Sequence, residues 1–337
     1  DIAAWCRIDF YVTTDEYYNS DLEDYYTVVS TNNPLYYAKH LYLNNQLVTN
    51  LEIPNSVTNI PSAFCNALDI CSVTIPNSVT NIDNSAFTGC SGLKNVEINS
   101  NAFGTCFSNN NSIQKIALGE QVTNIASNAF KDCSGLEEIS ISANLTSIGS
   151  SAFTNCNSLQ KVNINDIGAW CRIDFSSYTA NPLYYAKHLY LNNQIVTNLE
   201  IPNTVTSIKP YAFYNASDIS SVAIPNSVTS IDNSAFTGCS GLKNVEINTN
   251  TIGTWFSSNF QSVQKISLGE QVSSIANNAF NGCSGLTEIN VPSSMTSIGS
   301  SAFSGCSSLQ KVNIDDIAAW CRIDFSSYTA NPLYYAK

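Results

Sequence analysis

Apolar and polar positions alternate in short stretches that return along the whole chain. The stretches LKNVEI (93–98), LEEISI (136–141) and LQKVNI (159–164) each end in two apolar residues separated by one polar residue. Because a β-strand points successive side chains to opposite faces, we expect each stretch to bury the apolar pair and expose the residue between. A Pro or Asn-Ser turn and a second β-like run, such as VTSI (205–208), follow. Each unit therefore predicts one coil of a solenoid.

The units repeat with a period of 23 residues. The segment 75–98 recurs at 224–247 with a single difference, Asn81 against Ser230. Two longer gaps in the series of Ala-Phe pairs each hold an irregular coil, which contains Phe103 in the first copy and Ile252 in the second. We expect twelve stacked strands, ending near residues 53, 75, 98, 118, 141, 164, 201, 224, 247, 268, 291 and 314. The side chains that one coil buries cannot offset the conformational entropy lost when its backbone is ordered. Neighbouring coils must therefore cover one another's apolar faces.

The 23-residue units are themselves grouped into a longer repeat of about 150 residues. Its marker is a spacer that begins DIAAWCRIDF or DIGAWCRIDF and ends NPLYYAK, followed by LYLNNQ, which predicts a hairpin or a tight extra coil. We interpret residues 1–337 as one continuous solenoid that begins and ends in mid-pattern, as a piece of a longer array would. The predicted parts are super-repeats 1–165 and 166–315, a partial repeat 316–337, spacers 1–43 and 166–191, and an insertion 11–27.

This pattern is that of a β-rich leucine-rich-repeat solenoid. We expect a parallel sheet on its concave face, with short strands, turns and brief helical turns elsewhere. The polar residues are mostly Asn, Ser and Thr and only 12% of the chain is charged. Those side chains compete for backbone hydrogen bonds within helices, so helix should be scarce.

The motif IPNSVTSI…SAF…C…L…V…I resembles the BspA-type (Treponema pallidum-type) leucine-rich-repeat family of bacterial and protist surface proteins. The unit AWCRIDF…NPLYYAKHLYL is similar to a spacer of gut-bacterial members. The resemblance covers nearly all of the chain. It implies export, a secreted or cell-surface location, and adhesion to host matrix, to other cells or between copies.

The charge balance argues against nucleic acid as a partner. The formal net charge is −12, and the 14 Lys and Arg residues are spread along the chain, whereas phosphate binding needs them clustered. No stretch approaches the ~20 apolar residues that cross a bilayer. Asp1 begins a segment that reads as mature, without a signal peptide.

Most of the twelve cysteines are expected to be free and buried. Six of them follow an Ala-Phe phenylalanine by three residues, and Ala67 and Ala216 take the same place elsewhere, so the position favours a small apolar side chain. Cys65 and Cys71 differ, because they become Tyr214 and Ser220 together in the second copy. Joint loss is what a disulfide would produce, so a disulfide and two free thiols remain alternatives. The six are Cys90, Cys133, Cys156, Cys239, Cys283 and Cys306.

No catalytic, cofactor or metal site is predicted. The two histidines, His40 and His188, occupy the same place in two copies, whereas a catalytic site brings unlike groups together once. The chain has no phosphate-binding glycine loop, no nucleophile elbow and no metal-ligand spacing. We therefore expect a protein that is not an enzyme.

Alternating charges precede the central apolar residue of several predicted strands. Stacked coils would place these side chains one strand apart. An ion-pair ladder that fixes register is one interpretation and the one we favour; a mixed-charge strip that meets a partner is the other. The residues are Lys115, Glu138 and Lys161 in one copy, and Lys265, Glu288 and Lys311 in the other.

The insertion concentrates tyrosines and carboxylates. Tyrosine supplies contact area at low entropic cost, so this acidic, aromatic loop is a candidate for binding a basic protein, with an ornamental surface loop as the alternative. Its candidate residues are Tyr11, Tyr17, Tyr18, Tyr25, Tyr26, Asp15 and Glu16. For the whole chain we expect an extracellular adhesin or scaffold that binds protein or glycan on host or neighbouring cells. A self-associating spacer or stalk is the alternative.

Overall fold

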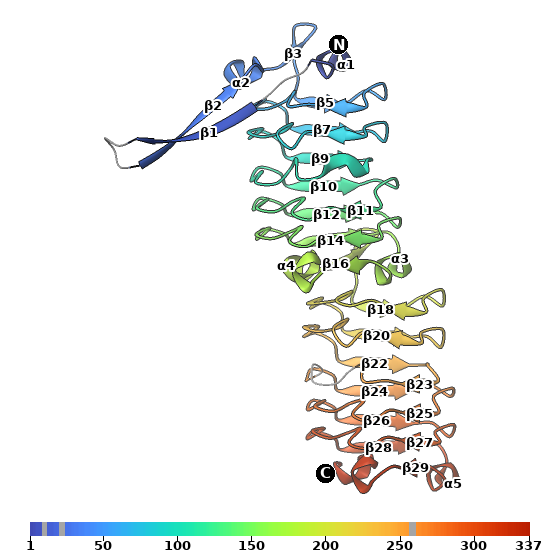
Figure 1. Cartoon of the computed structure of the whole chain (residues 1–337). Coiled ribbons are helices and arrows are strands. Elements are labelled where there is room, and N and C mark those ends of the chain that lie inside the picture. The colour runs from blue at the N-terminus through green and yellow to red at the C-terminus, as the bar shows by residue number, and fades with distance from the viewer. Residues whose placement is uncertain (9–11, 20–23, 256–260) are drawn as a thin grey trace. The chain divides into compact units, whose positions relative to one another are not determined.

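The computed structural model describes residues 1–8, 12–19, 24–255 and 261–337, with the backbone alone for 12–19 and 24–31. The chain forms two compact units, Asp1–Gln160 and Lys161–Lys337. Each unit is a solenoid of stacked coils with a parallel sheet, as Figure 1 shows. The predicted leucine-rich-repeat solenoid is therefore confirmed in both units. Its continuity over all 337 residues stays a prediction.

In the first unit five strands of one sheet run parallel, and each pairs with the strand of the next coil. Within a strand the first and third residues face outward, and the second and fourth are buried, as in Asn95–Ile98. The strands are β5 (Asn50–Glu52), β7 (Ser72–Ile75), β9 (Asn95–Ile98), β10 (Lys115–Leu118) and β12 (Glu138–Ile141).

Two-residue strands form the second side of each coil. They pair in parallel as β6 (Asn59–Ile60) with β8 (Asn81–Ile82) and β11 (Asn124–Ile125) with β13 (Ser147–Ile148). In the coil between β8 and β11 a 3₁₀ turn, η1 (Asn101–Phe103), takes the place of the short strand. This coil is the irregular one that the sequence indicates.

The first spacer carries two short helices and two hairpins. The helices are α1 (Ile2–Trp5) and α2 (Leu35–Ala38). A long hairpin pairs β1 (Val12–Asn19) with β2 (Asp24–Thr31), and a short one pairs β3 (Tyr42–Leu43) with β4 (Gln46–Leu47).

The second unit repeats this plan around its own sheets. Residues 161–195, which include the spacer of this unit, form β14 (Lys161–Ile164), α3 (Ile167–Cys171), β15 (Asp174–Phe175), η2 (Tyr178–Ala180), α4 (Leu183–Ala186), β16 (Leu189–Leu191) and β17 (Gln194–Ile195). The six-stranded sheet consists of β18 (Asn198–Glu200), β20 (Ser221–Ile224), β22 (Asn244–Ile247), β24 (Lys265–Leu268), β26 (Glu288–Val291) and β28 (Lys311–Ile314). The short strands are β19 (Ser207–Ile208), β21 (Ser230–Ile231), β23 (Thr251–Ile252), β25 (Ser274–Ile275), β27 (Ser297–Ile298) and β29 (Asp324–Phe325). The last coil ends in α5 (Ile317–Trp320), η3 (Tyr328–Ala330) and η4 (Pro332–Tyr334).

The twelve strand ends that the sequence predicts agree with the structure to within one residue. The LYLNNQ segment combines the two predicted forms: in the second unit β16 pairs in parallel with β14 and antiparallel with β17. Its turn residues Asn192 and Asn193 have φ values of 50° and 65°. Asparagine tolerates this left-handed conformation, which two-residue hairpin turns require.

A column of stacked phenylalanines runs through each core. Phe64 and Phe87 lie 5.7 Å apart with nearly parallel rings, and Phe213 and Phe236 lie 5.2 Å apart. Phe87 is followed by Phe107 at 5.2 Å rather than by Phe103, the residue that the repeat pattern points to. Phe103 stacks instead on Phe130 of the next coil at 5.6 Å, so the irregular coil contributes two rings, of which Phe107 lies outside any Ala-Phe pair.

The predicted cysteine column is buried, and its thiols also link neighbouring coils. The Cys90 thiol donates to the Phe64 carbonyl oxygen at 3.0 Å, and Cys239 donates to that of Phe213 at 3.1 Å. Cys133, Cys156 and Cys306 make the same contact with the phenylalanine 26 residues earlier. The position thus favours a weak donor as well as a small side chain.

Each spacer is tied to the coil that follows it by buried polar side chains. The Trp170 indole donates to the Ala212 carbonyl oxygen at 2.6 Å, and Trp5 does so to that of Ala63 at 2.8 Å. Asn181, which is fully buried, donates to the Tyr211 carbonyl at 2.7 Å and caps Leu183 N–H at 2.8 Å. These bonds give the Trp-Cys and Asn-Pro-Leu segments of the first two spacers a structural role.

We expect two of the twelve thiols to react rapidly with Ellman's reagent in the folded, reduced chain. Cys71 and Cys321 are exposed and the other ten are buried. The thiolate is the reactive form, and burial both blocks access and raises the pKa of the Cys133 thiol to about 12. Cys71→Ser and Cys321→Ser should each remove one fast equivalent, and urea should expose the remaining ten. A third fast thiol in the folded chain would contradict this burial.

We expect Cys239→Ala to flatten the loss of stability at alkaline pH. Burial raises the pKa of the Cys239 thiol from 9.0 to about 12, so above about pH 9 the unfolded thiol ionises while the folded one stays protonated. The free energy of unfolding therefore falls by ~1.4 kcal/mol per pH unit for each such thiol. Urea unfolding under reducing conditions, followed from neutral to alkaline pH, measures the slope. Ser240→Ala, at the adjacent position, should leave it unchanged.

Candidate functional site: the open faces of the two parallel sheets

In the first unit, polar side chains form two rows across the open face of the sheet. Strand pairing places the first residues of successive strands beside one another, and likewise the third residues. One row consists of Asn50, Ser72, Asn95, Lys115 and Glu138, and the other of Glu52, Thr74, Glu97, Ala117 and Ser140. A shallow hollow of about 340 Å³ lies over both rows between β7 and β12.

The second unit carries the same two rows. Its hollow, of about 440 Å³, extends over strands β18 to β24. The first row is Asn198, Ser221, Asn244, Lys265, Glu288 and Lys311, and the second is Glu200, Ala223, Glu246, Ser267, Asn290 and Asn313. The first five residues of the first row are the same in the two units.

The predicted ion pairs are present in the first row. Lys115 Nζ lies 3.5 Å from Glu138 Oε2, and in the second unit Lys265 and Lys311 lie 3.4 and 3.7 Å from Glu288 Oε1. Desolvation acts to raise the pKa of Glu288, but the two lysines outweigh it and hold that pKa below its ordinary value. Exposed pairs of this kind contribute little to stability, and the register-fixing role expected from the sequence stays a prediction.

Lys161 has a different environment from its counterparts. Its Nζ donates to Asn193 Oδ1 at 2.8 Å and lies 5.2 Å from the centre of the Tyr190 ring. Both partners belong to the LYLNNQ hairpin, whereas Lys311 stands where no such hairpin follows in this chain. Binding of a partner by any of these charged residues stays a proposal.

The predicted aromatic loop is in fact a β-hairpin. Its register places Tyr17 opposite Tyr26 and Tyr18 opposite Tyr25, while Asp15 and Glu16 lie opposite Val28 and Thr27. The many Thr, Tyr and Val residues in both segments explain the strands, because such residues favour a β conformation. Tyr11 lies outside the described residues.

Cys65 and Cys71 are free thiols in different environments, so the structure does not contain the disulfide considered from the sequence. Cys65 is buried, and the exposed Cys71 donates its thiol hydrogen to the Asp69 carbonyl oxygen at 3.4 Å. The joint replacement has another explanation at one position. Tyr214, which replaces Cys65, stacks on Tyr178 at 5.5 Å.

Tyr214 belongs to a tyrosine cluster that the sequence analysis missed. Tyr178 also meets Tyr184 at 5.4 Å and Tyr211 at 6.3 Å, and its side chain is the exposed member of the group. Burial and the three neighbouring phenols raise the pKa of Tyr214. The signal lay in the second copy, which has tyrosine at 211 and 214 where the first has Ser62 and Cys65.

The two histidines bind carboxylates at equivalent places. His40 Nδ1 lies 2.6 Å from Asp69 Oδ2, and His188 Nδ1 lies 2.5 Å from Asp218 Oδ2. Each pair joins a spacer to the next coil. Within the part of the chain that the structure describes, no group of three or more His, Cys, Asp or Glu side chains could hold a metal ion. No helix in that part has the length and apolar character to cross a membrane.

Comparison with known proteins identifies the repeat family. The BspA type leucine rich repeat region matches in six copies, over residues 61–179, 186–310 and 252–329. No curated protein sequence matches the chain.

Solved structures with a similar repeat pattern come from several bacteria. A leucine rich cell surface protein from Faecalibacterium prausnitzii is 24% identical, with 93% of this chain and 97% of that chain covered and a TM-score of 0.36. A leucine-rich repeat protein from Bacteroides ovatus is 22% identical, with coverages of 96% and 98% and a TM-score of 0.40. The T. pallidum leucine rich repeat protein is 16% identical, with coverages of 71% and 83% and a TM-score of 0.24. Since the repeat region spans more than half of its residues, this chain belongs to the BspA-type leucine-rich-repeat family.

Proposed function

We propose that this protein is an extracellular or cell-surface adhesin that binds a partner protein through the open faces of its two parallel sheets. The observation that carries the proposal is the pair of polar rows in each unit. The two rows lie beneath one hollow, of 340 Å³ in the first unit and 440 Å³ in the second. The rows combine carboxylates, amines, amides and hydroxyls on a rigid surface. A wide surface of this kind suits a protein partner better than a small substrate. Membership of the family supports the location.

The proposal excludes catalysis. Each His–Asp pair occurs in both copies, with the histidine more than 40% exposed, and joins a spacer to a coil. The ten buried cysteines have no access to a substrate. The histidine–aspartate pairs and the buried cysteines thus hold the stack of coils together.

A structural spacer or self-assembling stalk is the second candidate. It is supported by the near identity of segments 75–98 and 224–247, because a spacer requires only regular coils. Light scattering separates the two candidates: a molar mass that rises with concentration, without binding to any partner, favours the spacer.

We expect bulky substitutions on the sheet faces to weaken adhesion. Ala117→Trp and Ser267→Trp place an indole within the hollows of the first and second unit. Together they should weaken binding to immobilised fibronectin, laminin or collagen at least tenfold, a loss of about 1.4 kcal/mol. Surface plasmon resonance with the full chain measures this.

The controls are Asn55→Trp and Asn203→Trp, which add the same side chain at exposed turn positions. They should leave binding unchanged. Equal loss from the control pair, or full binding by the sheet-face pair, would place the contact elsewhere. Failure of the unaltered chain to bind all three proteins would contradict the adhesin proposal for matrix.

The tyrosine-rich hairpin is a second proposed contact with a basic partner. Deleting residues 12–31 removes both of its strands and leaves the coils of the first unit in place. We expect the deletion to weaken binding to a lysine-rich protein such as histone H1, with the melting temperature of the chain unchanged. Unchanged binding would remove the hairpin from the proposed contact surface.

A further inference from the structure

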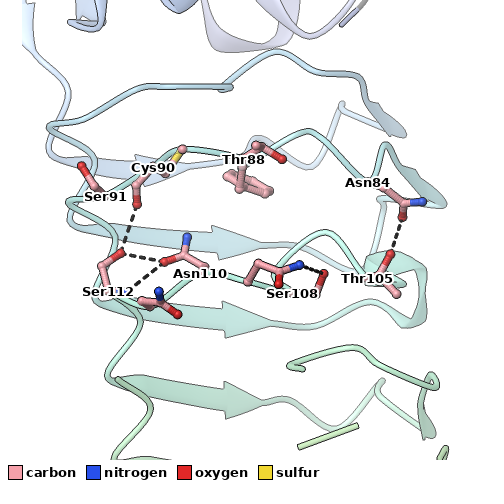
Figure 2. A pocket seen from close by; sticks show the side chains of 12 residues that line it. Asn84, Thr88, Cys90, Ser91, Thr105, Ser108, Asn110 and Ser112 are labelled. Atoms are coloured by element: carbon pink, nitrogen blue, oxygen red, sulfur yellow. Dashed lines mark hydrogen bonds between the residues drawn. The ribbon is translucent and has the colours of Figure 1, made fainter. Parts of the chain in front are cut away.

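We propose that the first unit also contains a binding site for a neutral oligosaccharide. The site is a hollow of about 620 Å³ that lies between the turn of one coil, residues 84–91, and the turn of the next, residues 105–112. Figure 2 shows Asn84, Thr88 and Ser91 on the first turn, above Thr105, Ser108 and Ser112 on the second. This site is separate from the polar rows of the sheet and does not depend on the proposed adhesion.

The hollow coincides with an irregularity in coil length. Strand β10 begins 20 residues after β9, at Lys115 and Asn95, whereas β9 begins 23 residues after β7, at Ser72. The short coil also replaces its second strand by η1 (Asn101–Phe103). The three missing residues lie between Ile98 and Phe107, so the turn 105–112 keeps the length of the turn 85–92 in the preceding coil. The hollow between these two turns falls in the ~300–1,000 Å³ range of small-molecule sites.

Most lining residues carry an amide or a hydroxyl group, carbon atoms also form part of the surface, and no lining residue is charged. Nine of its twelve residues are Asn, Ser or Thr, and none is Lys, Arg, His, Asp or Glu. Amides and hydroxyls each both donate and accept hydrogen bonds, as sugar hydroxyls do. A charged ligand would lose water without gaining an opposite charge, and an apolar ligand would leave the amides unpaired. A neutral compound with many hydroxyl groups meets both conditions.

Hydrogen bonds fix the two ends of the hollow and leave its middle available. Thr105 Oγ1 donates to Asn84 Oδ1 at 2.9 Å at one end. At the other end Ser112 Oγ lies 2.6 Å from Asn110 Oδ1 and 3.2 Å from the Cys90 carbonyl oxygen. Between them, the side chains of Thr88, Ser91 and Asn111 are exposed and make no hydrogen bond to any described residue.

The second copy offers a natural comparison. Its corresponding segment reads TWFSSNFQ (254–261) where the first has TCFSNNN (105–111), so it is one residue longer and has a single asparagine instead of three. Residues 256–260 of that segment lie outside the described part of the chain. The oligosaccharide site is therefore assigned in the first unit, where all of its lining residues are described.

The experiment is a titration of the full chain with maltotriose, cellotriose, mannotriose and triacetylchitotriose, using saturation-transfer NMR and calorimetry. A heparin tetrasaccharide is the charged comparison. At least one neutral trisaccharide should bind with a Kd of about 1 mM or tighter, and the heparin fragment should bind at least tenfold more weakly. No binding by any neutral trisaccharide at ~10 mM, or tighter binding of heparin, would overturn the proposal.

Matched substitutions then locate the bound sugar. Thr88→Ala and Asn111→Ala should each weaken binding about fivefold, the effect of one lost hydrogen bond. Ser91→Trp should abolish it by filling the hollow, while Ser240→Trp, at the same position of the second copy, should leave it intact. Sugar binding that survives Ser91→Trp overturns the assignment. The sheet-face variants Ala117→Trp and Ser267→Trp should keep full sugar binding. Failure of the adhesin proposal can therefore be distinguished from failure of the sugar-site proposal.

Discussion

The constraint on which this structure depends is that no coil can bury its own interior. Each coil presents an apolar edge that becomes core only when the next coil lies against it. Residues of one repeated motif show the difference: Ile167 is 7% exposed beneath a following coil, whereas Ile317, in the last coil of the chain, is 70% exposed. The coils approach closely: a Cβ added to Gly92 would lie 2.0 Å from the Leu68 carbonyl oxygen of the preceding coil. A side chain at Gly92 therefore requires a local shift between the two coils.

This dependence explains how much of the fold the sequence predicts. Alternation of polar and apolar residues locates all twelve strands, and repetition of the Ala-Phe pair locates the buried rings, because both signals lie within one coil. Relations between coils were harder to predict. The hydrogen bond from the Cys90 thiol to the Phe64 carbonyl joins residues 26 apart, and the sequence indicated only that the cysteine position is small. Phe107 was missed as a member of the ring column because it lies outside the repeated pair.

The candidate sites were predicted unevenly for a related reason. The charged row on the sheet face follows from strand register, so Lys265 and Glu288 were expected to meet and do. The tyrosine cluster depends instead on a spacer side chain, Tyr178, meeting the next coil at Tyr214. A comparison of the two copies did mark that position, as a lost cysteine. From the sequence alone, however, the replacement of Cys65 by Tyr214 indicated a lost disulfide as readily as a new aromatic contact.

In a repetitive solenoid, specificity must arise where the repetition fails. A regular coil offers the same groups as its neighbours, and the rigid stack prevents them from converging on a small ligand. A coil that is three residues short changes this locally, because its strand β10 keeps the register of the sheet while a 3₁₀ turn replaces its second strand. Phe107 stacks on the preceding coil and Phe103 on the next, so the ring column continues through that coil. The stability of the stack is thus separable from the shape of its turns, and the turns are free to vary. The polar rows recur in both units and suit a broad partner, whereas the hollow between residues 84–91 and 105–112 lies beside an irregular coil and suits a small ligand.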